Sequence, residues 1–380
     1  MEKDAEYEPA ALIGRDGLGR IIRALAEGGH EVIGPVVRDG AIVYETIDGI
    51  ADLPAGWTDR QAPGHYSIER RPDEALFGFT VGPHSWKQFL HPPTQTQWSA
   101  TRGEDGGLSF TPAQAAPKPL AFIGVRACEM QAIMIQDRIL RDGETADAGY
   151  ARRRNDAFIV AINCSEAGET CFCASMDAGP RVQTGFDLAL TELVSPGAHE
   201  FLVETGSAAG AALLAEIPRR PADTATLRQA EELSAQAAAS MGRTLDTRGI
   251  KELLQHNPEH ERWDDVAARC LSCGNCTMVC PTCFCTTTED IGDLHNRNVR
   301  REKTWDSCFT LDFSYIHGGS VRSSTRSRYR QWLTHKLANW IDQFGTSGCV
   351  GCGRCIAWCP VGIDLTEEVR AIRGEEEMAR

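Results

Sequence analysis

Two runs of cysteine in the last third of this 380-residue chain have the residue types and spacing to do chemistry. The first reads CLSCGNCTMVCP and the second CVGCGRCIAWCP, so in each run two, two and three residues separate the cysteines and proline follows the last. Three thiolates on one tight loop can each bind a different iron of a cubane, and this spacing is typical of [4Fe–4S] ligation. The cysteines are Cys270, Cys273, Cys276 and Cys280, then Cys349, Cys352, Cys355 and Cys359.

The fourth cysteine of such a run begins a helix that leads away, so in two-cluster ferredoxins it binds the other cluster. The sequence therefore predicts two [4Fe–4S] clusters with exchanged ligands: cluster one on Cys270, Cys273, Cys276 and Cys359, and cluster two on Cys349, Cys352, Cys355 and Cys280. Gly274, Gly351 and Gly353 are expected to let the backbone turn close to the sulfides. Zinc is the alternative, because paired cysteines also make tetrahedral zinc sites, but it does not explain two complete runs of four.

Four further cysteines lie in the first half of the chain, two of them in a TCFC sequence that occurs again after the first run. They follow apolar stretches that read as strands, and loops at the ends of neighbouring strands could bring them together. Four thiolates is the number that a [4Fe–4S] cluster or a zinc ion requires. A third metal site is therefore a hypothesis for Cys128, Cys164, Cys171 and Cys173. In the alternative, Cys128 and Cys164 are small buried hydrophobic residues.

An insertion of 68 residues separates the two runs, far more than in a small ferredoxin. It holds three extra thiols, Cys283, Cys285 and Cys308, which we expect to pack around cluster one without binding it. The reason is that a cluster already has four ligands.

The insertion also contains a basic stretch, VRSSTRSRYRQWLTHKL, which could indicate nucleic-acid binding. Because the chain is acidic, we prefer a helical face that neutralises cluster and carboxylate charge or docks a partner. The residues concerned are Arg322, Arg326, Arg328, Arg330 and Lys336.

Composition narrows the function classes further. The formal net charge of −14 argues against general binding of nucleic acid, which needs a basic face. Residues 250–380 carry 16 Lys/Arg and 18 Asp/Glu, so nearly all excess acid lies earlier in the chain. The acidic residues 1–6 contain no apolar run, and no stretch is long enough to cross a bilayer. We therefore expect a cytoplasmic protein with reduced thiols and no membrane contact.

The elements that must position these cysteines predict an α+β protein. GRIIRALAEGGHEVIGPV reads as a helix ended by two glycines and followed by a strand, and LAFIGVRACEMQAIMIQDRIL as a buried strand and an amphipathic helix. AFIVAINC, FDLALTEL and HEFLVETG read as further strands. We expect a mixed α/β domain over 1–220, a helical bridge over 221–250, and a mostly helical dicluster ferredoxin-like domain over 251–380.

Several segments resemble the beta subunit of cytoplasmic sulfhydrogenases, the NADP-linked [NiFe] hydrogenases, within the 4Fe–4S dicluster-domain family. They are also similar to the electron-transfer subunit of the anaerobic sulfite reductase. The segments are FIGVRACEMQAIMIQDRIL, YARRRNDAFIVAINCSEAGETCFCASMDAGP, WDSCFTLDFSY, RYRQWLTHKL and the double cysteine run. One departure is that Ala127 and Glu129 stand where Pro and Asp are expected.

The resemblance implies an iron–sulfur electron-transfer subunit beside a flavin subunit that handles NAD(P)H, relaying single electrons to a catalytic [NiFe] hydrogenase. Two alternatives stay open. The chain could be the electron-transfer subunit of an anaerobic sulfite reductase, or its α/β domain could itself bind flavin or substrate. The chain has no spare cysteine pairs for nickel and no Gly-x-Gly-x-x-Gly after a strand. We therefore expect it to pass electrons while other subunits turn over substrate.

Overall fold

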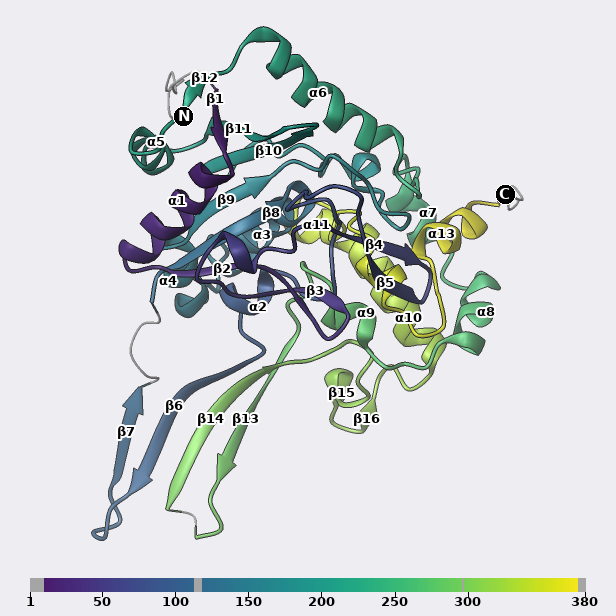
Figure 1. The fold of residues 1–380 in the computed structure, drawn as a ribbon. Helices are drawn as coiled ribbons and strands as arrows, with labels where there is room; N and C mark the ends of the chain where they lie inside the picture. The colour runs from purple at the N-terminus through teal and green to yellow at the C-terminus, as the bar shows by residue number, and fades with distance from the viewer. Residues whose placement is uncertain (1–9, 113–117, 296, 375–380) are drawn as a thin grey trace.

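The structure is a computed structural model that describes residues 10–112, 118–295 and 297–374. The acidic N-terminal residues 1–6 lie outside the described ranges. A layered α/β part, a projecting arm and a mainly C-terminal part around the cysteine runs make up the molecule (Figure 1). The α+β class predicted from the sequence is confirmed.

An eight-stranded mixed sheet forms the centre of the α/β part. Its four middle strands are parallel, and the pairs toward both edges are antiparallel. The strands β8 and β9 are buried along their whole length, as expected where helices cover both faces. In spatial order the strands are β12 (Arg220–Pro221), β1 (Ala11–Gly14), β11 (Ala198–Thr205), β10 (Leu188–Ser195), β9 (Phe158–Ile162), β8 (Leu120–Arg126), β2 (Glu31–Arg38) and β3 (Ala41–Thr46).

Helices cover both faces of this sheet. The helices α1 (Arg15–Glu27) and α5 (Ala208–Ala215) pack on one face, and α1 buries Leu18, Ile21 and Leu25 at helical spacing. The other face carries α3 (Ala127–Leu140), α4 (Ala148–Asn155) and α6 (Thr224–Ala239). The strands and helices read from the sequence here are confirmed. Ala230 of α6 packs against the sheet, so most of the expected bridge covers this face.

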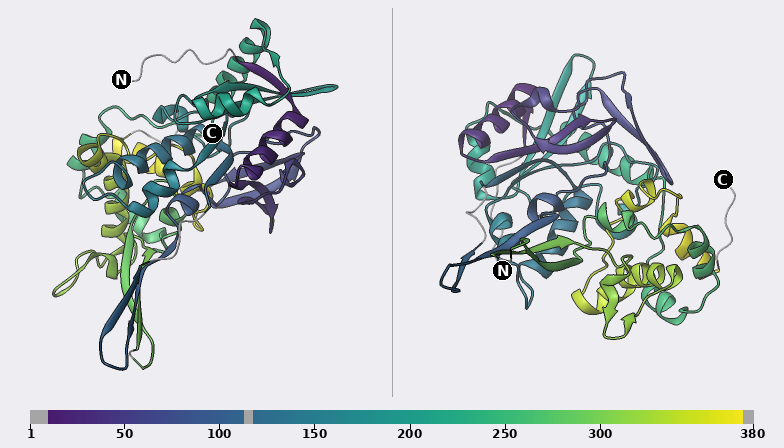
Figure 2. Two further views of the ribbon diagram at one scale, coloured as in Figure 1. Left: turned by 90° about the vertical axis from the view of Figure 1, so that its left-hand side faces the viewer. Right: turned by 90° about the horizontal axis from the view of Figure 1, so that it is seen from below.

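A four-stranded antiparallel arm projects from the body (Figures 1 and 2). Two of its strands come from the N-terminal half and two from the insertion between the cysteine runs, so the insertion is not wholly helical. The arm exposes Leu108, Phe110 and Leu294. In spatial order its strands are β13 (Thr286–Gly292), β14 (Asn298–Trp305), β6 (Thr94–Arg102) and β7 (Leu108–Pro112).

Short helices surround the cysteine runs, with a core around Trp263, Leu333 and Val369. They are α7 (Ile250–His256), α8 (Arg262–Arg269), α9 (Asn275–Met278), α10 (Thr325–Thr334), α11 (Trp340–Phe344), α12 (Arg354–Ala357) and α13 (Leu365–Arg373), with a π-helical turn at His335–Asn339. The remaining elements are the hairpins β4 (Trp57–Ala62)–β5 (His65–Arg70) and β15 (Tyr315–Ile316)–β16 (Gly319–Ser320), and helix α2 (Lys87–Leu90). No helix in the described ranges has an apolar stretch that could span a bilayer.

One buried ion pair joins the sheet to the C-terminal part. Arg354 of α12 donates to Glu129 of α3 at 2.5 Å, and both side chains are fully buried. The other carboxylate oxygen accepts hydrogen bonds from the Tyr44 hydroxyl (2.8 Å) and the Trp86 indole (3.1 Å). The Arg354 guanidinium also donates to the carbonyl of His84 at 2.8 Å. The second cysteine run is thereby held against the first turn of α3.

Replacing Arg354 by Met should destabilise the protein strongly, because it leaves the Glu129 carboxylate buried without a counter-ion. Removing one partner of a buried pair costs about 3–5 kcal/mol of unfolding free energy. Denaturant unfolding of the anaerobic protein measures the loss. The control is Arg38→Met, which breaks an exposed pair with Glu45 and should leave the midpoint nearly unchanged. Equal small shifts in both variants would contradict the role given to Arg354.

Candidate metal centres

The four thiols expected for cluster one line a single cavity. Cys270, Cys273 and Cys276 come from the first run, and Cys359 comes from the second. Burial raises the pKa of Cys276 well above its ordinary value, and the nearby thiols of Cys308, Cys270 and Cys359 add to the shift. The structure therefore brings the last cysteine of the second run to the loop of the first.

The aromatic wall of this cavity was not predicted from the sequence. Phe309, Tyr329 and Trp332 line it together with Ile363, and three of these four residues come from the insertion. Tyr329 and Trp332 lie three residues apart on α10, so helical spacing was the available signal. These side chains exclude water from one side of the thiols.

The thiols expected for cluster two also gather, around Cys280. Burial raises the pKa of Cys349 to about 12 and that of Cys352 to about 11, and the neighbouring Cys280 thiol adds to both shifts. Cys280 acts in the same direction on Cys355, which also lines the first cavity. The last cysteine of the first run thus lies with the second, because α9 and α12 contact each other.

Each group consists of thiols only, as the ligand set of a [4Fe–4S] cluster does. Within the described residues, no three His, Cys, Asp or Glu side chains converge as the ligands of one metal ion do. Ligands of a cubane bind separate irons, so they stand farther apart than the ligands of one zinc. Two groups of four thiols, each on a loop that turns at a glycine, match the cluster arrangement.

The glycines of the second run have a close neighbour. Gly351 and Gly353 have φ of +67° and +77°, which confirms the expected tight turn. A Cβ atom on Gly353 would lie 2.4 Å from the Thr170 hydroxyl oxygen, and one on Gly351 would lie 2.6 Å from the backbone of Phe172. The loop of the second run therefore packs directly on the first TCFC sequence.

A buried lysine lies at the second group of thiols. The Lys336 ammonium is 3.2 Å from the Cys280 sulfur and donates to the carbonyl of Gly348 at 3.0 Å. Burial opposes its charge, but the thiols of Cys280 and Cys283 outweigh burial and raise the pKa of Lys336. In return, a hydrogen bond from Cys283 and the charge of Lys336 hold the pKa of Cys280 well below its usual value. Both contacts therefore favour the thiolate form of Cys280, which is the form that binds metal.

The extra thiols are distributed differently from our expectation. Cys308 does lie beside Cys276, in the first group. Cys283, expected near cluster one, instead hydrogen-bonds Cys280 in the second group. The physical reason is that the Thr282 hydroxyl donates to the carbonyl of Gly348 at 2.6 Å, which pins this segment to the second run. Cys285 lies between them, within electrostatic reach of both Cys283 and Cys308.

The basic stretch mainly contacts the protein itself. Arg326 and Arg330 pair with Glu259, and Arg328 donates to the carbonyl of Phe309 at 2.7 Å. Arg322 donates to the Ser314 hydroxyl at 2.7 Å, and Lys336 is the buried lysine beside Cys280. These contacts favour the interpretation of the basic stretch as a helical face that neutralises carboxylate and thiolate charge.

The four N-terminal cysteines also come together. Strands β8 and β9 are parallel neighbours, so Cys128 and Cys164, which follow them, lie at the same sheet edge. A hydrogen bond with Cys173, together with burial, raises the pKa of Cys128 well above its usual value. Burial also raises the pKa of Cys171 well above its usual value, and the nearby thiols of Cys128 and Cys164 add to the shift. The loops at the ends of neighbouring strands therefore meet as the sequence suggested.

The geometry agrees with comparisons to known proteins. Residues 269–363 match the family model of the 4Fe-4S dicluster domain. The C-terminal part is a dicluster domain. The chain is also 28% identical over 345 residues to sulfhydrogenase 2 subunit beta of Pyrococcus furiosus, an alignment covering 90% of this chain and 92% of that protein. The resemblance found in the sequence is thereby confirmed, and no solved structure matches the chain significantly.

Gly353→Ala in the dicluster domain should destabilise more than Gly345→Ala. Both glycines have positive φ, so each alanine costs about 1–2 kcal/mol of backbone strain. A Cβ atom meets nothing within 4 Å at Gly345 but clashes with Thr170 at Gly353, which adds about 1–3 kcal/mol. Unfolding of the two variants side by side measures the difference. Equal losses would show that the two loops do not pack as described.

Proposed function

We propose that this protein is an iron–sulfur electron-transfer subunit of a sulfhydrogenase-type complex, with two [4Fe–4S] clusters in its dicluster domain. The observation that carries the proposal is the exchange of cysteines: Cys359 lies with the first run and Cys280 with the second. Two independent zinc sites have no need of such an exchange. The ligands we assign are Cys270, Cys273, Cys276 and Cys359 for cluster one, and Cys349, Cys352, Cys355 and Cys280 for cluster two.

When bound, each cluster takes up or releases one electron without a change of bonds. The chain's own residues create the conditions for this. Contact between α9 and α12 keeps the two groups of thiols in one unit, and Cys355 borders both. The aromatic wall around Tyr329 and Trp332 limits water, and Lys336 places a fixed positive charge at Cys280. Burial and nearby charge are the means by which a protein sets cluster potentials.

The proposed partners are a flavin subunit that handles NAD(P)H and a [NiFe] hydrogenase subunit, in the cytoplasm. The name of the Pyrococcus furiosus relative supports assembly in a sulfhydrogenase. Exposed apolar side chains on the arm, including Leu108 and Phe110, favour contact with other subunits. Hydrogen oxidation releases two electrons and two protons, and NAD(P)⁺ takes up two electrons and one proton. Clusters that each carry one electron can connect these two-electron reactions when the two take place in separate subunits.

Serine variants test the exchanged ligands. Cys359→Ser should remove the same cluster as Cys276→Ser, and Cys280→Ser the same cluster as Cys349→Ser, each with a loss of about four irons per chain. Iron analysis and the EPR spectrum of the reduced protein identify which cluster is lost. Cys308→Ser is the control, because this thiol lies beside Cys276 but outside both proposed ligand sets, and it should keep all iron. A Cys359→Ser spectrum that matched Cys349→Ser would show that ligation is not exchanged.

Purification of the intact complex tests the assignment to a sulfhydrogenase. A tag on this chain, used under anaerobic conditions in its own host, should recover nickel and flavin in the same complex. That complex should reduce NAD(P)⁺ with hydrogen gas, at a rate lost in Cys276→Ser. A complex with sirohaem and sulfite-dependent oxidation of NAD(P)H, without nickel, would instead place this chain in a sulfite reductase.

A further inference from the structure

We propose that Cys128, Cys164, Cys171 and Cys173 hold a third [4Fe–4S] cluster, at the edge of the large sheet and directly beside cluster two. This site lies outside the dicluster domain matched by the family model. Its place in an electron path rests on the proposed function, whereas the site itself is argued from the residues around it.

Topology brings the ligands to one place. β8 and β9 are adjacent and parallel, with Arg126 opposite Ile162, and the segments that follow them carry all four cysteines. Ligand sites in parallel sheets form where the carboxyl ends of strands meet. Cys128 comes from the first turn of α3, and the other three from the loop after β9.

Three of the four thiols are buried, and glycines lie beside two of them. Cys128, Cys171 and Cys173 are buried, and none of the four is in a disulfide. A Cβ atom on Gly179 would come within 3.1 Å of the Cys173 sulfur, and one on Gly168 within 3.3 Å of the Cys171 sulfur. The backbone therefore approaches two of the thiols more closely than a larger residue allows.

A buried cation offsets the charge of such a site. A [4Fe–4S] core with four thiolates is an anion, and a buried anion needs nearby positive charge. Arg126 is 2% exposed, and one guanidinium nitrogen lies 3.7 Å from the Cys164 sulfur. Another donates to the carbonyls of Phe77 (2.9 Å) and Phe79 (2.6 Å), which orients the group.

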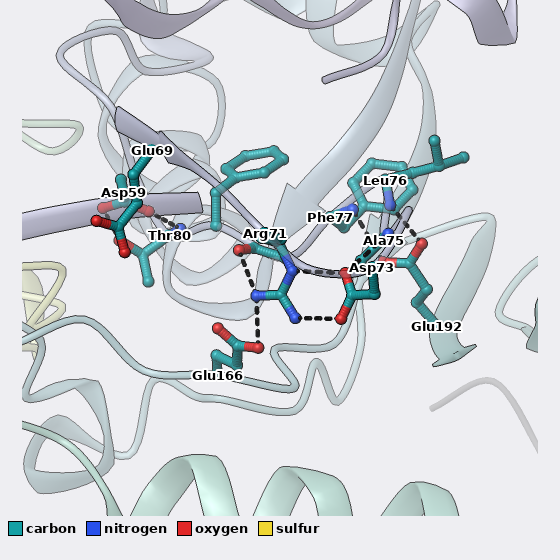
Figure 3. Close-up of polar contacts among 12 residues, drawn as sticks. Asp59, Glu69, Arg71, Asp73, Ala75, Leu76, Phe77, Thr80, Glu166 and Glu192 are labelled. Carbon is teal, nitrogen blue, oxygen red and sulfur yellow. Dashed lines mark hydrogen bonds and ion pairs between the residues drawn. The ribbon is translucent and has the colours of Figure 1, made fainter. Parts of the chain in front are cut away.

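Residues 71–80, whose polar contacts Figure 3 shows, contact both Arg126 and the cysteine loop. The Glu192 carboxylate accepts hydrogen bonds from the backbone N–H groups of Leu76 (2.6 Å) and Phe77 (2.8 Å). Arg71 pairs with Asp73 and reaches across to Glu166, in the loop between Cys164 and Cys171, at 2.6 Å. These hydrogen bonds and ion pairs fix the residues that support the proposed site.

The proposed cluster would lie next to cluster two. The N–H of Phe172 donates to the carbonyl of Gly351 at 2.8 Å, and the Cys171 sulfur is 4.0 Å from the carbonyl oxygen of Cys352. Cys352 and Cys128 also pack in the same apolar cluster. The segments that carry the two proposed sites are therefore in direct contact. In an electron transfer between the two sites, one cluster loses one electron and the other gains it. No proton moves and no bond changes.

Variants in the N-terminal loop test the site. Cys164→Ser and Cys171→Ser should each lower iron and acid-labile sulfide from about twelve to about eight per chain. The EPR signals of clusters one and two should persist, because their ligands are untouched. Cys308→Ser is the matched control, since it removes a buried thiol outside the site and should keep about twelve irons.

A second measurement guards against variants that do not fold. In the anaerobic wild-type protein, Cys164 should resist alkylation until a chelator removes iron, although it is the least buried of the four thiols. About eight irons in both wild type and variants, one zinc ion per chain, or a Cys128–Cys173 disulfide found by mass spectrometry would each overturn the proposal. Failure of the proposed function is a separate result, in which Cys276→Ser loses no iron.

Discussion

The buried ion pair between Glu129 and Arg354 is the constraint on which the rest of the arrangement depends. Burying two charges is costly unless each is paired and hydrogen-bonded. Here Tyr44 and Trp86 donate hydrogen bonds to the Glu129 carboxylate, and backbone carbonyls accept hydrogen bonds from the Arg354 guanidinium. The two charges lie on α3, directly after Cys128, and on α12, directly after Gly353. The pair therefore sets how the dicluster domain packs against the sheet. It also brings the N-terminal thiols close to the thiols of the second cysteine run.

Buried positive charge is the second recurring feature. The chain carries a formal net charge of −14, and the thiolate ligands of the proposed clusters would add negative charge in its interior. Lys336 at Cys280 and Arg126 at Cys164 each lie within 4 Å of a sulfur. Lys87, also buried, donates to the carbonyl of Cys283 at 3.1 Å and stacks on Trp305. Local cations thus allow an acidic protein to bury anionic sites.

Local patterns in the sequence predicted the two cysteine runs, the proposed exchange of their ligands, and the central strands of the large sheet with some of the helices that cover it. The expectation that the N-terminal cysteines meet also followed from local patterns, because Cys128 and Cys164 each follow an apolar strand. Long-range pairings were not accessible in this way. The arm depends on β14 pairing with β6, about two hundred residues earlier, and neither strand has a distinctive apolar alternation.

Single side chains show the same limit. Glu129 stood out in the sequence only as a departure from the family pattern, and its partner Arg354 is 225 residues away. Lys336 was grouped with the arginines of a basic stretch, which are half-buried, whereas Lys336 lies in a π-helical turn and is buried in the core. Both assignments depend on tertiary packing, which hydrophobic periodicity does not encode.

The most direct test of the account is the content of iron, acid-labile sulfide and zinc per chain in protein purified without oxygen. The account predicts iron and sulfide in equal amounts, about twelve of each, and no stoichiometric zinc. Zinc in place of iron, without sulfide, would contradict the electron-transfer role, because zinc does not change its oxidation state. The cysteines would then be structural ligands that hold the fold together.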